Sequence, residues 1–478
     1  MTDRRLLPPG RVLGLAAALL LAGCGSMIPE YLRPAVPVAA SFPQAGGAEA
    51  ATPLAADIAW QDHFQDERLK RLITIALANN RDLRVAALAI EQARALVDVR
   101  RADQLPTVSA GIAGSRQPGA NGNSTTLYTA GLQITGYEFD FFGRLRSLTG
   151  VALAQYLASE EARKTAQIAL IAGVASTHLA LQADDELLAL TRRTLQTRGD
   201  SLRLNRLRFD NGAASAFELR QAESLLESAQ VALAQATRQR ALDENALVLL
   251  LGQPLPADLP PAQPLGTASL GELPVGLPSE VLTRRPDVRQ AEQQLIAANA
   301  NIGAARAAFF PRISLTGNLG TASTELSGLF KSGSYAFTGT GQLLQPLFDA
   351  GRNRAGLESA RAGRDIAVAQ YERSIQSAFR EVADALAGRA TLGEQLRAQA
   401  AQTNALAITY RLADLRYRAG AASYLDALDA QRSLFTAQQA LVQVRALQLQ
   451  NAVALYRVLG GGWTEDAAAP VATVAPPR

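Results

Sequence analysis

The sequence predicts a mainly α-helical chain that also contributes to a transmembrane β-barrel, with four β-strands and long coiled-coil helices in each protomer. Three observations predict this fold class. Alanine and leucine dominate while aromatic residues make up only 5%, which favours long helices. Four short runs alternate apolar and polar residues, as strands with one apolar and one polar face do. The chain is also duplicated at a spacing of about 208 residues, as between Gly212 and Gly420.

Composition and charge exclude several classes of protein. Hydrophobic residues make up 48% of the 478 residues, which is too many for a disordered chain. The net charge is only +4 and forms no basic block, so we expect no nucleic-acid partner. One cysteine and two distant histidines exclude a disulfide scaffold and predict no metal site and no catalytic residue. No uninterrupted apolar run reaches the roughly 18 residues of a spanning helix, which excludes a polytopic helical membrane protein.

The N-terminus resembles the signal of a bacterial lipoprotein. Three arginines precede an apolar run of about 11 residues, too short to span a bilayer, and Leu21-Ala22-Gly23-Cys24 resembles a lipobox. We predict a signal peptide over 1–23, and Cys24 with a diacylglycerol and an N-acyl chain at the start of a lipidated extended leader over 24–60. A glycine follows Cys24, which by resemblance to lipoprotein sorting favours the outer membrane. Such chains anchor firmly, at about 0.8 kcal/mol per buried CH₂. The alternative is an uncleaved signal with an incidental cysteine.

The internal duplication defines the predicted domains. Glycines, prolines and charged residues recur in the same order, which chance matching in an Ala/Leu-rich chain does not explain. The matched segments include Gly212-Ala213-Ala214-Ser215 with Gly420-Ala421-Ala422-Ser423, and Gly143-Arg144 with Gly351-Arg352. We predict a first structural repeat over 61–252, a Pro/Gly-rich linker or equatorial segment over 253–278, a second repeat over 279–462 and a C-terminal tail over 463–478.

Each repeat is predicted to contain the same elements in the same order. A helix comes first, at Arg81–Gln104 or Pro286–Phe309, and two strands and two long helices follow it. In the first repeat the strands are expected at 107–116 and 126–136, and the long helices at 145–210 and 213–251. In the second repeat they are expected at 312–321 and 335–345, and at 354–418 and 421–459. A helix of about 64 residues is a rod of roughly 95 Å, longer than a globular core needs.

Four strands are too few to close a membrane barrel, and an open sheet edge in lipid is prohibitively costly. Strands of about 9–11 residues with apolar residues outward and polar residues inward fit a transmembrane barrel. Other copies of the chain must therefore close the edges, and three protomers would give 12 strands. The alternative is a soluble α/β protein whose strands are buried in a core, which leaves the long helices unexplained.

Several segments spread over the chain carry sequence motifs: Cys24 with Ile28 to Pro34, Tyr137 to Arg146, Arg284 to Val288, Gln345 to Arg352 and Leu425 to Gln431. These motifs resemble those of TolC/OprM-type outer-membrane efflux proteins, in the lipoprotein or NodT-like branch. The resemblance implies a homotrimer with a 12-stranded barrel and a 12-helix periplasmic tunnel in the outer membrane of a Gram-negative bacterium. It also implies a periplasmic adaptor (membrane fusion protein) and an inner-membrane pump, often of the resistance-nodulation-division type, as partners.

The breaks between the long helices are the candidate functional sites. By the resemblance they are the periplasmic tips that the adaptor recognises, at Asn211 and Gly212 and at Arg418-Ala419-Gly420-Ala421. Asp426 and Asp429 are spaced i,i+3 and so share one helix face. The resemblance places an acidic entrance constriction at these two residues, with Glu218 as the first-half match to Asp426, and threefold symmetry would make rings that favour cations. The alternative is that they are ordinary solvated carboxylates.

The expected function is a passive exit duct for drugs or other small toxic compounds, without catalysis and without a cofactor other than the covalent lipid. Two other classes remain open: the outer-membrane conduit of a type I protein-secretion system, and a non-transporting structural lipoprotein. A spacer of the latter kind would need no amphipathic strands. No phosphate-binding glycine loop or nucleophile elbow indicates an enzyme. The run Asp184-Asp185-Glu186 is interpreted as a solvated helix face rather than a metal site.

Overall fold

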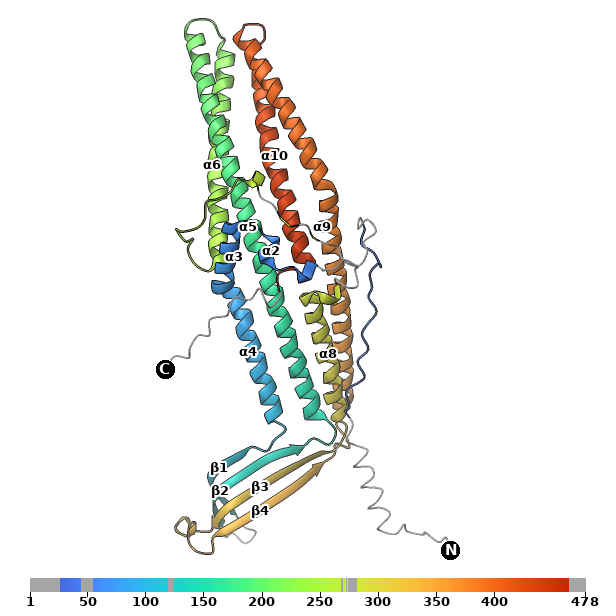
Figure 1. The fold of residues 1–478 in the computed structure, drawn as a ribbon. Helices are drawn as coiled ribbons and strands as arrows, with labels where there is room; N and C mark the ends of the chain where they lie inside the picture. Colours follow the sequence, from blue (N-terminus) through green and yellow to red (C-terminus); the bar gives the residue numbers. More distant parts are fainter. Residues whose placement is uncertain are drawn as a thin grey trace. The chain divides into compact units, whose positions relative to one another are not determined.

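The computed structural model describes residues 26–43, 55–118, 124–267, 270–271, 273 and 282–463. These residues form two compact units, and Figure 1 labels their helices and strands. Unit 1 contains the described residues of Met1–Val36, Leu88–Glu160 and Arg289–Arg373, and unit 2 those of Pro37–Ala87, Glu161–Val288 and Ser374–Arg478. Each unit contains residues from both sequence halves. Cys24 lies outside the described residues.

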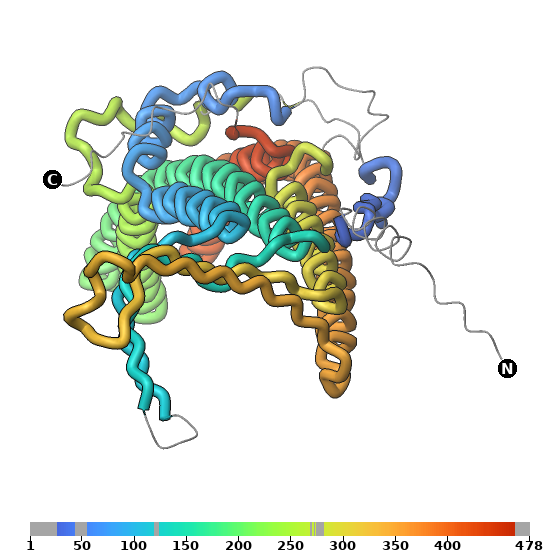
Figure 2. Tube along the Cα trace, turned by 90° about the horizontal axis from the view of Figure 1, so that it is seen from below, coloured from blue at the N-terminus to red at the C-terminus, as the bar shows by residue number. Residues whose placement is uncertain are grey.

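Unit 1 contains a four-stranded antiparallel sheet in the order β1-β2-β3-β4. Pairing of β2 with β3 ends at Tyr128 and Ser323, and beyond this point the two hairpins point in different directions (Figure 2). The predicted mainly helical fold with four strands in one chain is confirmed, and the longest strand extends beyond its predicted range at both ends. The strands are β1 (Val108–Pro118), β2 (Ser124–Phe139), β3 (Arg312–Ser323) and β4 (Tyr335–Leu344).

The strand register sorts the side chains of the sheet onto two faces. Leu132 lies opposite Leu319, which in turn lies opposite Phe337, so apolar side chains line up across three strands. The alternate positions form a polar face, where Gln133 lies opposite Asn318. This is the alternation that the sequence predicts, because successive strand residues point to opposite faces.

A row of small residues crosses the polar face of the sheet. Gly111 lies opposite Gly131, Gly131 opposite Gly320, and Gly320 opposite Ala336. A Cβ added to Gly131 would lie 2.6 Å from the Cα of Gly320, and a Cβ added to Gly320 would lie 2.5 Å from the Cα of Gly131. The close approach of β2 and β3 therefore requires glycine at both positions.

The leader is fastened to helix α8 (Pro286–Ala307) within unit 1. Asn299 Nδ2 donates to the carbonyl of Pro29 at 2.8 Å, and Arg306 donates to the carbonyl of Met27 at 3.3 Å. Gly303 leaves the space that Ile28 fills, since a Cβ there would lie 2.7 Å from a side-chain carbon of Ile28. Hydrogen bonds from two α8 side chains to leader carbonyl groups, together with one glycine, thus hold the leader along this helix.

Long helices make up most of the other described residues, and the two longest continue from unit 1 into unit 2. At 67 residues each, α5 and α9 are rods of about 100 Å. The other helices of the described residues are α2 (Trp60–His63), α3 (Glu67–Asn79), α4 (Arg81–Ala102), α5 (Arg144–Asp210), α6 (Ala216–Leu251), α9 (Arg352–Arg418) and α10 (Tyr424–Val458), with short 3-10 turns at Ala55–Asp57, Leu265–Thr267 and Leu326–Gly328.

The apolar core of unit 2 contains α3, a helix that the sequence analysis did not identify. Asp66 caps its N-terminus by accepting hydrogen bonds from the amides of Arg68 and Leu69, and the second carboxylate oxygen lies 2.9 Å from Nε2 of His178 on α5. Helices α3, α5, α6 and α10 contribute buried side chains that pack together in this core. They include Leu72, Ile73, Ile171, Leu247, Leu251 and Tyr456.

Helix α5 also contains the one stretch among the described residues that is long and apolar enough to span a membrane by length and composition. The sequence analysis did not identify this stretch, because it required an apolar run without interruption, and polar residues interrupt this one. In the structure 61% of this stretch is buried within the protein. Burial within the protein therefore accounts for most of its apolar residues.

Candidate functional site

Both helix-to-helix turns of unit 2 end the preceding helix in the same way. The amide of Ala213 donates to the carbonyl of Arg208 at 2.7 Å, and that of Gly212 to Phe209 at 2.9 Å. In the second turn Ala421 and Gly420 make the corresponding bonds to Arg416 and Tyr417. Gly212 and Gly420 have φ of 72° and 73°, so each turn is a Schellman motif, in which the left-handed residue favours glycine.

The same turns begin the following helices with capping boxes. Ser215 accepts from the amide of Glu218, whose carboxylate accepts from the amide of Ser215 at 2.9 Å. Ser423 and Asp426 make the same pair of bonds at the start of α10. Because Ser215 and Ser423 are the N-cap residues of these boxes, α6 and α10 begin at Ala216 and Tyr424 rather than at 213 and 421. Two of the three predicted constriction residues therefore also stabilise helix starts.

The structure places the predicted site residues at the tips but gives them different environments. Asp426 and Asp429 are both exposed on α10, and Asp429 lies 3.9 Å from Arg432. Arg418 pairs with Asp414 at 2.9 Å. Asn211, Gly212, Ala419, Gly420 and Ala421 are exposed, as a docking surface requires. Among the residues that the structure describes, no hydrogen bond or ion pair joins Glu218 to Asp426 or Asp429.

Two tyrosines beneath the tips join the two halves of the chain, and the sequence analysis missed them. The Tyr417 hydroxyl donates to Oδ1 of Asn205 on α5 at 3.1 Å, and the Tyr424 hydroxyl lies 3.3 Å from Ser201 Oγ. Burial raises the pKa of Tyr417, and the nearby Glu218 carboxylate adds to this effect. The duplication offered a signal for one of them, because an aromatic residue occupies the matching position in both halves, Phe209 in the first and Tyr417 in the second.

A buried arginine lies in the same helical region. Arg198 on α5 is 3% exposed and donates to the carbonyl of Leu225 at 3.0 Å and to Ser228 Oγ at 2.7 Å. Its guanidinium lies 5.1 Å from the ring centroid of Phe435 on α10. Burial lowers the pKa of Arg198. These contacts tie α5 to α6 and α10 near the tips.

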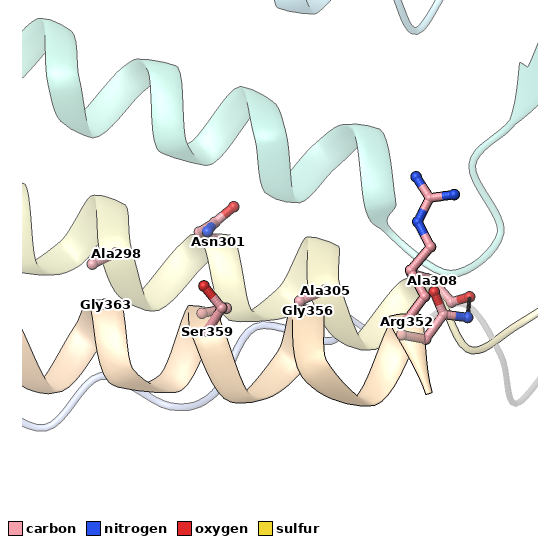
Figure 3. A pocket seen from close by; sticks show the side chains of 10 residues that line it. Ala298, Asn301, Ala305, Ala308, Arg352, Gly356, Ser359 and Gly363 are labelled. Carbon is pink, nitrogen blue, oxygen red and sulfur yellow. Dashed lines mark hydrogen bonds between the residues drawn. The ribbon is translucent and has the colours of Figure 1, made fainter. Parts of the chain in front are cut away.

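Unit 1 has a groove of about 430 Å³ between α8 and α9 (Figure 3). Small residues such as Gly356 and Ala305 line it, together with Arg352, Asn301 and Ser359. Asn353 donates to the carbonyl of Ala308 at 3.0 Å across this junction. Among the described residues no group of three or more His, Cys, Asp or Glu side chains could hold a metal ion.

The fold and the duplicated tips are those of a known class of channel. A family model described as "Outer membrane efflux protein" matches residues 72–253 and 277–461. The chain belongs to the outer membrane efflux protein family, and it is the outer-membrane channel component of an efflux system.

Individual relatives cover nearly the whole chain. The solvent efflux pump outer membrane protein SrpC of Pseudomonas putida is 46% identical over 95% of this chain and 98% of its own length. The antibiotic efflux pump outer membrane protein ArpC of the same organism is 48% identical over 94% of this chain and 95% of its own. A crystal structure of the open state of the MtrE outer membrane channel of Neisseria gonorrhoeae has a TM-score of 0.84 at 40% identity, covering 93% of this chain and all of that one.

Proposed function

We propose that three copies of this chain form a passive duct through the outer membrane, with a 12-stranded barrel and a 12-helix periplasmic tunnel. The observation that carries this proposal is the strand register, which gives the four-stranded sheet one mainly apolar face and one mainly polar face. A sheet of this kind fits a barrel with lipid outside and water inside.

The edges of the sheet support the proposed oligomer. Strands β1 and β4 each pair on one side only within the described chain, and an unpaired edge in lipid is costly. Pairing of β4 with β1 of the next copy satisfies both edges. The exposed Tyr335, Phe337 and Leu343 on the apolar face, at 72%, 70% and 63% exposure, would then contact lipid rather than water.

The tips supply the proposed entrance and docking surface. Repeated by threefold symmetry, Asp426, Asp429 and Glu218 would form rings of carboxylates, which favour cations. Asn211, Gly212 and Arg418 to Ala421 would contact a periplasmic adaptor, which links the duct to an inner-membrane pump of the resistance-nodulation-division type. The pump, not the duct, would select the substrate, and the protein would catalyse no reaction.

The names of the relatives support drugs, solvents or other small toxic compounds as the cargo. The second candidate, a conduit for protein secretion, gains no support from these names. A structural spacer is disfavoured because it would need no sheet with an apolar outer face.

We also propose that Cys24 carries the lipid anchor in the outer membrane. The support is the lipobox and the leader fastened along α8 from Met27 onward. The variant Cys24→Ala should lose labelling by radioactive palmitate. Label that persists on the mature variant would contradict the lipidation.

The duct is tested with purified protein in native mass spectrometry and planar bilayers. The expected results are a trimer and steady single-channel currents, and Asp426→Asn/Asp429→Asn should lower the preference for cations and raise the conductance. A monomer without channel activity would contradict the proposed function. Unchanged selectivity of the double variant would contradict only the acidic constriction.

A further inference from the structure

The charged residues of the sheet are few and lie on different faces. Among the described strand residues they are Arg116, Glu138 and Arg312. Glu138 lies opposite Ser314 on the polar face, and Arg312 is two positions from Ser314 and therefore shares that face. Arg116 lies opposite Thr126, in phase with the apolar positions of β2.

Two arginines compete for the single carboxylate on the polar face. Arg144 at the start of α5 binds Glu138 at both oxygens, with distances of 2.7 and 2.8 Å. This hydrogen bonding raises the pKa of Arg144. The Nε atom of Arg312 lies 3.3 Å from Oε2 of the same carboxylate. One negative charge therefore faces two positive charges.

The exposures show which arginine remains available to solutes. The side chain of Glu138 is 16% exposed and that of Arg144 is 28% exposed, whereas that of Arg312 is 58% exposed. The neighbouring acids have partners of their own, because Asp140 pairs with Arg146 at 3.5 Å and Asp103 with Arg100 at 3.1 Å. The excess positive charge of this part of the polar face thus resides on the Arg312 guanidinium.

We propose that Arg312 gives the sheet-lined part of the duct a preference for anions, so that carboxylate- or sulfonate-bearing solutes are favoured there. This inference rests on the proposed function, since the polar face lines a lumen only when copies of the chain close the barrel. Three symmetry-related guanidinium groups would then form a basic ring, and rings of Arg or Lys favour anions. Salt screens such a ring over about 10 Å at 0.1 M ionic strength, so its effect is largest in dilute salt.

The test measures reversal potentials of the full chain in planar bilayers under a dilute KCl gradient. Arg312→Gln should lower the chloride-to-potassium permeability ratio by about twofold or more, Arg312→Glu should lower it further, and Arg312→Lys should retain the wild-type ratio. Arg116→Gln is the matched control, because it removes the same charge from the opposite face and should leave the ratio unchanged.

The outcomes separate this inference from the proposed function. If the wild type conducts and Arg312→Gln has the same permeability ratio, the inference is overturned while the proposed duct stands. A ratio that falls equally in Arg116→Gln would also overturn it, since the effect would then not belong to the polar face. A wild-type chain that conducts no current would overturn the proposed function and this inference with it.

Discussion

Arg33 and Glu292 form a two-point ion pair between the leader and α8, with Nε to Oε1 at 2.7 Å and a terminal guanidinium nitrogen to Oε2 at 2.8 Å. Tyr31 donates to the same carboxylate at 3.1 Å. Burial, reinforced by Glu292, raises the pKa of Tyr31 to about 12, so this hydroxyl remains a donor at neutral pH. One carboxylate therefore holds two leader side chains.

Neutralising this carboxylate should loosen the leader. Glu292→Gln should lower the free energy of local opening by about 1 kcal/mol, because the pair is partly exposed, and so speed amide exchange of the leader roughly fivefold. Hydrogen–deuterium exchange with mass spectrometry measures this rate. Glu358→Gln breaks an exposed pair on α9 and should leave leader exchange unchanged; equal rates in all three proteins would contradict the role of Glu292.

The contact of β2 with β3 should not tolerate a methyl group. Gly131→Ala should strain the sheet by about 1–3 kcal/mol, as overpacking does, because the added Cβ meets backbone atoms. The expected result is a lower yield of detergent-stable oligomer in outer-membrane extracts. Gly341→Ala is the control, since nothing lies within 4 Å of a Cβ there. Equal yields from both variants would contradict the constraint.

His63 should make the protein less stable in acid. Its ring is 1% exposed and stacks on Tyr456 at 4.3 Å, both ring nitrogens lack a hydrogen-bond partner among the described residues, and burial lowers its pKa to about 4. Between pH 6.5 and 4 the unfolded state binds the proton and the folded state does not, so stability falls by about 3 kcal/mol as the pH drops through this window. Denaturant titrations of His63→Phe should lack this loss; an identical loss would assign it to other groups.

Asp184 should have the opposite pH dependence. It is 7% exposed, and burial, with a second contribution from Asp243, raises its pKa to about 7. The folded state keeps the proton that the unfolded state releases from about pH 4 upward, so this group's contribution falls as the pH rises toward 7. Asp184→Asn should be more stable than wild type above pH 7 in thermal unfolding. A lower melting temperature at pH 8 would contradict this account.

The two exposed aspartates of α10 should differ in their effect on stability. Asp426→Asn removes the carboxylate of a capping box and should cost about 0.5–1 kcal/mol, whereas Asp429→Asn, one turn further on, should cost almost nothing. Denaturant unfolding followed by circular dichroism compares the two variants. Equal losses of unfolding free energy in the two variants would contradict a stabilising role for the capping box formed by Ser423 and Asp426.

Much of the fold could be predicted because its determinants are local. Alternation of apolar and polar residues located all four strands, and the glycines at 212 and 420 located the turns between the long helices. The helix α3 was missed although Asp66 and the spacing of Leu69, Leu72, Ile73 and Ala76 indicate a capped amphipathic helix.

The contacts of the tips could not be predicted because they join distant parts of the chain. Tyr417 and Asn205 lie 212 positions apart, and no local pattern pairs them. The interpretation of Asp184 as solvated was wrong, since the structure buries it. A run of acids usually faces water, and only the packing of α5 shows that this member of the run does not.

The attachment of the leader also determines which structural element receives a mechanical force applied at the N-terminal side of the chain. The carbonyl groups of Met27 and Pro29 accept hydrogen bonds from α8 side chains, and Ile28 packs at Gly303. The chain passes from α8 into β3 a few residues after the end of the helix. A pulling force on the leader would therefore be transmitted through α8 to strand β3, because the leader is bound to α8 and is not a free linker.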